Sequence, residues 1–357
     1  MTHASLTNPN RIYSASWASQ VFALLRDLFT ALLGLTAPAI ALVGLWLFYD
    51  RSYTLALVFF IILATVLALA VASALPVLHP RRSQSKCTPA DFGIARWDDV
   101  RFSAVDRVEL SGWFIPSDPQ SDGATLILVH GLGGNRGDML EHAQMLVSKG
   151  YGVLLFDLRN HGASAGTLTT LGYSEAEDVC GAFAYLLTRQ EVNPQRIGLV
   201  GYSMGAAAVL RAAARIAQVR AAIAESAYTS LEDNIAQGVT AKTGLPPFPF
   251  APVMIWLGER MTGLRIHQIR PIDDVAQMTP RPLLFVHGAQ DSTVNVKNSV
   301  ALYQAASGPK GLYLIDKAGH TGLVSADPAE FERRITGFLD WSLRGVDRRH
   351  APRSIAD

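Results

Sequence analysis

The chain has 357 residues, with 31 Lys or Arg and 30 Asp or Glu, so its formal net charge is +1. This balance argues against a nucleic-acid-binding protein, whose basic residues gather on one face. Two cysteines exclude a disulfide scaffold and a cysteine-rich zinc site. Hydrophobic residues make up 49% of the chain and charged residues 17%, which argues against disorder and indicates more apolar surface than an ordinary soluble domain carries.

The apolar surplus lies in two neighbouring runs near the N-terminus. Residues 28–49 and 53–78 hold no charged residue, and as helices both are long enough to cross a hydrocarbon core about 30 Å thick. Only three residues separate the two runs. We therefore expect a transmembrane helical hairpin over 28–78, preceded by an N-terminal segment over 1–27.

Basic residues flank the predicted hairpin on both sides. They are Arg11 and Arg26 before it, and Arg81, Arg82 and Lys86 after it. Because positively charged flanks stay in the cytoplasm, we expect both termini and the whole chain after the hairpin to be cytoplasmic, with the lipid bilayer as a partner.

An alternative for the second run is a secretory signal peptide. Ala72-Ser73-Ala74 has the small residues of a cleavage site. The run is long for a signal peptide, however, and another apolar run precedes it. A membrane anchor is therefore favoured.

After a linker over 79–92, short apolar β runs alternate with helical stretches, up to a basic tail over 346–357. Strands are expected at 99–102, 108–115, 125–129, 152–156, 196–200, 221–224, 282–286 and 312–315, and helices at 136–149, 173–189 and 206–217, among others. This alternation predicts an α/β fold with a mostly parallel sheet covered on both faces. In such sheets the catalytic and ligand-binding residues lie at the carboxyl ends of the strands.

The strongest chemical signal is Gly201-Tyr202-Ser203-Met204-Gly205, which follows an apolar strand and opens an alanine-rich helix. A serine on a sharp strand-to-helix turn is crowded, and glycines two residues before and after it relieve that crowding. The hydroxyl of Ser203 is then expected to project above the sheet as a nucleophile.

A serine nucleophile needs a base, and the base needs an orienting carboxylate. The chain order that accompanies this turn is serine, acid, histidine. Asp291 and His320 follow in that order, each just beyond an expected strand. Glu225, which follows another strand, is the rival acid, and Asp157 and Asp316 are weaker ones.

Negative charge that develops on a carbonyl oxygen during attack needs hydrogen-bond donors already in place. The N–H of Met204, the residue after the nucleophile, is expected to supply one. The second is expected from the glycine-rich turn 130–135, where the N–H of Leu132 is the best candidate. The alternative is that these glycines only make a tight loop.

Residues 231–270 are longer than an ordinary connection between strands and are expected to form an inserted cap. Its apolar side chains include Phe248, Phe250, Trp256 and Met261. We expect these four to line an acyl pocket or to touch the bilayer. The alternative is that they pack on the core as any insertion would.

Together these motifs resemble the α/β-hydrolase superfamily over an expected domain at 93–345. The matching pieces are His130-Gly131, the run from Asp157 to Ser164, the pentapeptide 201–205, the run from His287 to Asp291, and Gly319-His320. The resemblance implies an eight-stranded sheet with helices on both sides and no cofactor. The membrane-anchored layout resembles serine hydrolases of the monoacylglycerol lipase, lysophospholipase and protein depalmitoylase kinds. One departure is Asn160, where many relatives carry glycine.

The sequence therefore predicts a membrane-tethered serine hydrolase acting on carboxylic esters or thioesters, with acyl lipids or acylated proteins preferred. The other histidines show no metal-ligand spacing, so no metal is expected. The same triad also serves serine peptidases and perhydrolases, which stay as alternatives within enzymes. From another class, the alternative is an inactive membrane-anchored interaction protein.

Overall fold

The computed structural model describes residues 42–43, 51–244 and 246–346. By its internal contacts the chain divides into two compact units, Met1–Ala68 and Leu69–Asp357. The long helix α2 (Arg51–Leu78) begins in the first unit and ends in the second.

Within the described residues, one helix is long and apolar enough to cross a membrane, the segment Tyr53–Leu78 of α2. Large apolar side chains such as Phe59 and Phe60 are exposed along it. The sequence predicts a second such helix over 28–49. Apart from Leu42 and Val43, that helix lies outside the described residues.

The second unit is built on one eight-stranded sheet. Its strands are β1 (Asp98–Ser103), β2 (Glu109–Ile115), β3 (Thr125–Val129), β4 (Gly152–Phe156), β5 (Ile197–Tyr202), β6 (Ala221–Glu225), β7 (Leu283–Gly288) and β8 (Lys310–Ile315). Their order is β1-β2-β4-β3-β5-β6-β7-β8. The pairs β1–β2 and β2–β4 are antiparallel, and all other pairs are parallel. The predicted eight-stranded, mostly parallel sheet is confirmed.

The central strands read as continuous apolar runs because both of their faces are buried. All five residues of β3 are buried. Ile127 and Val129 point into one hydrophobic cluster, whereas Leu126 and Leu128 point into the cluster on the opposite face. Because side chains alternate between the two faces along a strand, β3 contributes to a hydrophobic cluster on each face of the sheet.

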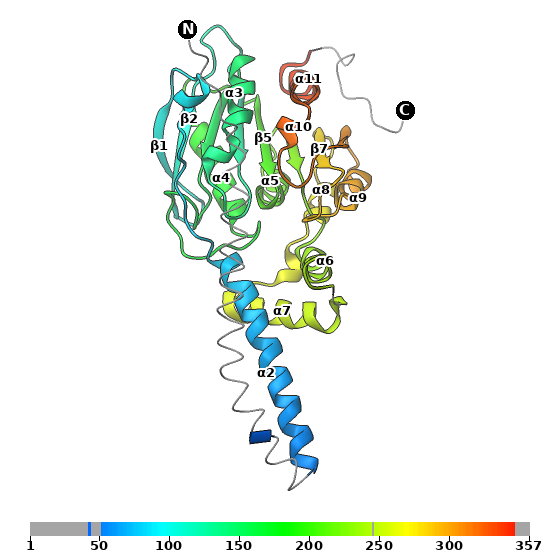
Figure 1. Cartoon of the computed structure of the whole chain (residues 1–357). Coiled ribbons are helices and arrows are strands. Elements are labelled where there is room, and N and C mark those ends of the chain that lie inside the picture. The colour runs from blue at the N-terminus through cyan, green and yellow to red at the C-terminus, as the bar shows by residue number, and fades with distance from the viewer. Residues whose placement is uncertain (1–41, 44–50, 245, 347–357) are drawn as a thin grey trace, which may run out of the picture. The chain divides into compact units, whose positions relative to one another are not determined.

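Helices cover both faces of the sheet (Figure 1). The helical elements between Leu78 and the cap, and after the cap, are η2 (Pro89–Phe92), η3 (Arg136–Met139), α3 (Leu140–Ser148), α4 (Glu175–Leu186), α5 (Met204–Arg215), α8 (Pro271–Ala276), α9 (Lys297–Ala305), α10 (Leu323–Ala326), α11 (Pro328–Leu339) and a π-helical turn η5 (Asp340–Arg344). Buried side chains of α4, α5, α8 and α9 join the first cluster, and those of α3, α10 and α11 join the second. The helix expected at 206–217 begins two residues earlier, directly after Ser203.

Between β6 and β7 the chain forms two longer helices, α6 (Leu231–Thr243) and α7 (Pro247–Thr262), and a short turn η4 (Ile266–Gln268). These elements occupy the segment expected as the cap. Ser230 begins α6 by accepting a hydrogen bond from the N–H of Asp233, and Gly244 ends it in the left-handed conformation. Because β6 and β7 are parallel neighbours, this insertion starts from the carboxyl edge of the sheet.

Candidate active site

Ser203 occupies the bend between β5 and α5 with a strained backbone, at φ 55° and ψ −118°. Its neighbours must be small for this bend to form. A Cβ atom on Gly201 would lie 2.4 Å from the carbonyl oxygen of Gly205, and one on Gly205 would lie 2.4 Å from the carbonyl oxygens of Val129 and His130. The glycines therefore let α5 pack directly against the end of β3.

The structure brings Ser203, His320 and Asp291 together. The Nδ1–H of His320 donates to Oδ2 of Asp291 at 2.7 Å. This leaves Nε2 of His320 as the acceptor for the hydroxyl of Ser203, at 3.0 Å. A base within hydrogen-bond reach of the hydroxyl, itself oriented by a carboxylate, is the arrangement that activates a serine.

Asp291 is held by four donors. Its Oδ1 accepts the backbone N–H groups of Thr293 at 2.8 Å and Val294 at 2.9 Å. Its Oδ2 accepts from His320 and from Nε2 of the buried His287, which is 3.1 Å away. Burial of the carboxyl raises its pKa, but the hydrogen bonds from His287 and His320 outweigh burial and bring the pKa of Asp291 well below its usual value. The carboxylate therefore stays ionised beside the imidazole.

The contact from His287 to Asp291 is one that the sequence interpretation did not predict. The ring does hold its loop, because its Nε2–H also reaches the carbonyl oxygen of Val294 at 2.9 Å and its Nδ1 accepts the hydroxyl of Ser299 at 2.6 Å. The spacing of four residues between His287 and Asp291 was the available signal.

The loop that carries His320 is held by hydrogen bonds to its backbone carbonyl oxygens. The hydroxyl of Tyr202 donates to the carbonyl oxygen of His320 at 2.7 Å. The backbone N–H of Gln290 donates to the carbonyl oxygen of Ala318 at 2.9 Å. The second contact ties the loop after β8 to the loop that carries the acid. Both loops leave the carboxyl ends of neighbouring parallel strands.

The rival acids have other partners. The carboxylate of Glu225 is buried and contacts Nε2 of His142 at 3.1 Å. Asp157 accepts the backbone N–H groups of Arg136 at 2.7 Å and Ala163 at 2.9 Å. Asp316 is exposed at the end of β8. These positions leave Asp291 as the acid that contacts His320.

The two expected oxyanion donors belong to segments that adjoin the nucleophile. Met204 is the first residue of α5, and the turn that holds Leu132 approaches Ser203 so closely that a Cβ on Gly131 would lie 3.2 Å from Cβ of Ser203. Among the hydrogen bonds of the described residues, none is donated by the N–H of Leu132 or Met204. Both amides stay the expected donors to an incoming oxygen.

Two buried histidines fix the turn 131–135, called here the oxyanion turn after the donor expected on it, to the loop after β4. His130 donates from Nδ1 to the carbonyl oxygen of Gly131 (2.7 Å) and accepts at Nε2 from the N–H of Leu158 (3.0 Å). His161 accepts at Nε2 from the N–H of Gly133 (3.1 Å). Burial, with a smaller effect from the nearby ring of His161, lowers the pKa of His130 to about 3. Burial also lowers the pKa of His161. Both rings therefore stay neutral and keep their acceptor nitrogens.

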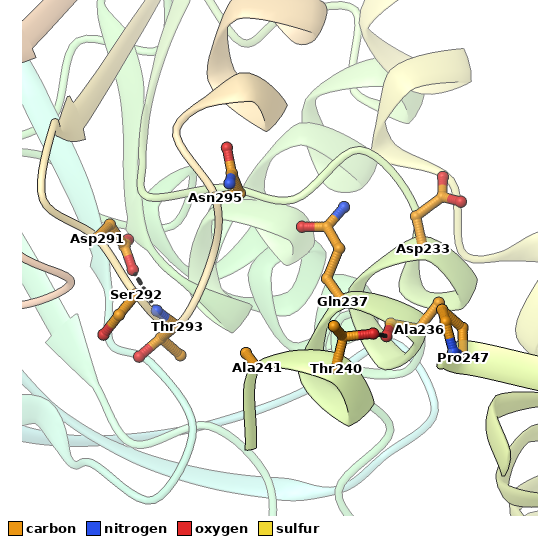
Figure 2. Close-up of a pocket in the computed structure, with 10 residues that line it drawn as sticks. All are labelled: Asp233, Ala236, Gln237, Thr240, Ala241, Pro247, Asp291, Ser292, Thr293 and Asn295. Carbon is orange, nitrogen blue, oxygen red and sulfur yellow. Dashed lines mark hydrogen bonds between the residues drawn. The ribbon is translucent and has the colours of Figure 1, made fainter. Parts of the chain in front are cut away.

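A cavity of about 450 Å³ lies between α6 and the loop that carries the acid (Figure 2). Its lining residues are Asp233, Ala236, Gln237, Thr240, Ala241, Pro247, Asp291, Ser292, Thr293 and Asn295. Most of these side chains are polar.

None of the four apolar residues expected at an acyl pocket lines this cavity. Phe248, Phe250, Trp256 and Met261 all lie on α7. Phe248 is 77% exposed and Trp256 52% exposed. The position of these side chains at the surface of the cap is compatible with contact to an apolar partner.

Comparison with known proteins places these features in a family. A model of the alpha/beta hydrolase family matches residues 126–334. The protein YfhR of Escherichia coli K12 is 31% identical over 242 residues, which cover 66% of this chain and 78% of YfhR. YqkD of Bacillus subtilis is 27% identical over 252 residues, covering 67% of this chain and 82% of YqkD. Among solved structures, the esterase Pf2001 of Pyrococcus furiosus superposes with a TM-score of 0.62 at 28% identity, covering 75% of this chain and 98% of the esterase.

The neutral state of His130 predicts a specific loss of stability in acid. An unfolded histidine titrates near pH 6.5, so between pH 6.5 and about 3 the unfolded chain binds a proton that the folded chain refuses. The free energy of unfolding therefore falls by roughly 1.4 kcal/mol for each unit by which the pH is lowered in that window. His130→Gln carries no titrating group, so its Tm should fall less than that of the wild type between pH 6.5 and pH 4.5, measured on the full chain in detergent.

The matched control is His267→Gln, which removes an exposed histidine of the cap, 61% exposed at its side chain. This variant should follow the wild-type Tm across the same range. Parallel curves for the wild type and His130→Gln would contradict a neutral buried ring at position 130.

Proposed function

Because the chain belongs to the alpha/beta hydrolase family, we propose that it is a membrane-tethered serine hydrolase that cleaves carboxylic esters or thioesters. The observation that carries the proposal is the chain of contacts from the hydroxyl of Ser203 through His320 to Asp291, at 3.0 and 2.7 Å. The likeness to a solved esterase supports ester chemistry over other reactions of the same triad.

In the proposed reaction, the hydroxyl of Ser203 attacks the acyl carbon while Nε2 of His320 takes its proton. Asp291 stabilises the imidazolium through the Nδ1–H contact. The imidazolium then gives its proton to the leaving alcohol or thiol, and the acyl group stays on the serine. Water, deprotonated by His320, attacks the acyl-enzyme and releases the carboxylic acid, which restores the free hydroxyl.

The charge that develops on the acyl oxygen is assigned to the N–H groups of Leu132 and Met204. Donors fixed in advance stabilise the transition state more than the ground state, because they need no reorganisation during the reaction. The neutral rings of His130 and His161 support this role, since they fix the turn on which Leu132 lies.

Acyl lipids or acylated proteins are the proposed substrates, with Phe248, Phe250, Trp256 and Met261 of the cap contacting the acyl chain or the bilayer. The apolar helix Tyr53–Leu78 supports a tether. In this proposal that helix is the second of a hairpin over 28–78, which follows a cytoplasmic segment over 1–27. Tethering raises the local concentration of amphiphilic substrate at the interface.

The rest of the proposed layout is a linker over 79–92, a cytoplasmic hydrolase domain over 93–345 with its cap at 231–270, and a tail over 346–357. The sequence Ala72-Ser73-Ala74 lies inside the continuous helix α2. The end of that helix is bonded to the hydrolase unit through the carbonyl oxygen of Leu78. Both observations favour a retained anchor over a cleaved signal peptide.

The nucleophile is tested with a fluorophosphonate probe, which phosphonylates an activated serine. The wild type should be labelled, and Ser203→Ala should not. Ester and thioester hydrolysis should fall roughly 10³-fold or more in Ser203→Ala, while the Tm stays close to that of the wild type. Absence of labelling in both proteins, on a folded wild type, would contradict the proposal and favour an inactive interaction protein.

Two isosteric amide substitutions test the acid. Asp291→Asn removes the charge that stabilises the imidazolium, so kcat should fall by roughly 10³-fold or more. Glu225→Gln makes the same chemical change at a carboxylate that contacts His142, and it should keep most of the activity. The reverse ranking, measured on one soluble ester, would reassign the acid to Glu225.

The two cysteines provide a test of the proposed orientation. Cys87, in the linker, is exposed, whereas Cys180 is half-buried in α4 and burial raises the pKa of its thiol to about 11. A membrane-impermeant maleimide should therefore label Cys87 in permeabilised cells and spare it in intact cells. A Cys87→Ser variant, which should stay unlabelled in both, is the control. Labelling of Cys87 in intact cells would contradict a cytoplasmic linker.

A further inference from the structure

The last turn of α2 forms hydrogen bonds with the loop that follows β4, and both segments belong to the second compact unit. The carbonyl oxygen of Leu78 accepts the N–H of Thr169 at 2.9 Å and the side-chain amide of Asn160 at 3.1 Å. The next residue, His79, contacts the carbonyl oxygen of Thr167 through Nδ1 at 2.8 Å. The end of the apolar helix is thus fastened to a loop at the carboxyl edge of the sheet.

Asn160 uses both ends of its side chain at this junction. Its Nδ2 donates to Leu78 and to Oγ1 of Thr169, each at 3.1 Å. Its Oδ1 lies 3.4 Å from Nη2 of Arg82, which also donates to the carbonyl oxygen of Gly166. Nη1 of Arg82 donates to the carbonyl oxygen of Ser164 at 3.0 Å. Asn160 is 5% exposed, so these partners replace water around its amide.

The backbone of Asn160 is in the left-handed region, at φ 60°. This conformation is strained for residues other than glycine, although asparagine tolerates it better than most. A glycine would relax the backbone and lose the three side-chain partners. The contacts of the amide therefore offset a local strain, which distinguishes Asn160 from a residue that only shapes a turn.

The residue that follows Asn160 reaches the oxyanion turn. His161 accepts the N–H of Gly133, the residue directly after Leu132. Its Nδ1–H donates to the carbonyl oxygen of Arg159 at 2.8 Å. The orientation of the His161 ring therefore depends on the backbone of Arg159 and of His161 itself, the two neighbours of Asn160. A shift of that backbone moves the acceptor that holds the oxyanion turn.

The linker after Arg82 contacts the segment on the other side of the same turn. Ser85 packs against Gly137 in the first turn of η3, where a Cβ would lie 2.1 Å from Oγ of Ser85. Further along, the side-chain amide of Gln144 in α3 donates to the carbonyl oxygen of Phe92 at 2.9 Å. The end of α2 thus contacts the loop that holds the turn 131–135, and the linker contacts the segment that follows this turn. We call the contacts of Leu78, His79 and Arg82 with residues 160–169 the anchor junction.

From these contacts we propose that Asn160 is a positioning residue that couples the end of the membrane helix to the oxyanion turn through His161. The inference rests on the proposed hydrolase function and adds to it: the anchor junction helps to fix the donor at Leu132 as well as tethering the enzyme. Because a misplaced donor weakens transition-state stabilisation more than substrate binding, the coupling should be seen in kcat.

The test uses Asn160→Gly in the full chain, since glycine accepts the native backbone and removes only the side chain. The variant should lose about 10-fold in kcat on a soluble short-chain ester, with KM within about 2-fold of the wild type. Arg107→Gly is the matched control, because Arg107 is also left-handed, at φ 68°, but is exposed on the turn between β1 and β2. This control should keep wild-type kcat.

A double-mutant cycle with His161→Ala separates positioning from general stability. If Asn160 acts through His161, adding Asn160→Gly to His161→Ala should leave kcat unchanged, although it lowers kcat in the wild-type background. Equal fold-losses in kcat in both backgrounds would overturn the coupling. So would an Asn160→Gly variant whose Tm falls while kcat, measured well below that Tm, stays at the wild-type value.

Hydrogen exchange provides a readout that does not depend on catalysis. Backbone amides of the peptide covering 131–135 should exchange faster in Asn160→Gly than in the wild type or Arg107→Gly. Unchanged exchange would overturn the coupling even if the enzyme is active. Faster exchange in a protein that hydrolyses no ester, and whose Ser203 takes no fluorophosphonate, would support the coupling and overturn the proposed function.

Discussion

The bend at Ser203 is the constraint on which the rest of the site depends. A serine at φ 55° costs of order 1–3 kcal/mol, and the surrounding structure must impose it. The N–H of Ser203 donates to the carbonyl oxygen of Glu225 at 2.8 Å, which ties the bend to the neighbouring parallel strand. Gly205 lets the following helix approach the end of β3, so the bend is fixed between three strands.

The residues at the bend could be predicted from sequence because their requirements are local. Small residues two positions either side of Ser203 follow from crowding at a strand-to-helix turn, and Asp291 and His320 follow from strand ends that a parallel sheet brings to one edge. Each prediction needed only a strand boundary and a residue type. The structure places the three side chains in one chain of hydrogen bonds.

Other features depend on contacts between distant segments, which have no local signature. The apolar character of Phe248 and Trp256 predicted an acyl pocket or contact with the bilayer, but composition does not determine which face of α7 points outward. In the structure both side chains lie exposed. Asn160 was noticed only as a departure from glycine. Its partners Leu78 and Arg82 are about 80 residues away in the chain, so its part in the anchor junction required coordinates.

The histidines near the site divide by environment into two kinds. His130, His161 and His287 are buried, and both ring nitrogens of each are engaged by fixed partners. A ring of this kind cannot exchange a proton with a substrate without breaking a contact that holds a loop. His320 differs, because one nitrogen contacts a carboxylate and the other contacts only a hydroxyl that is itself the reacting group.

This division of roles links stability to chemistry. The neutral rings of His130 and His161 hold the turn that carries the proposed oxyanion donor, and they can do so because burial lowers the pKa of each. In the proposed reaction, the imidazole of His320 takes the proton of Ser203 as negative charge forms on the acyl oxygen, and Asp291 stabilises the imidazolium. The proposed mechanism thus separates the rings that hold loops from the ring that exchanges a proton with the serine. Asn160, which contacts the end of α2, directly precedes one of the loop-holding rings, His161.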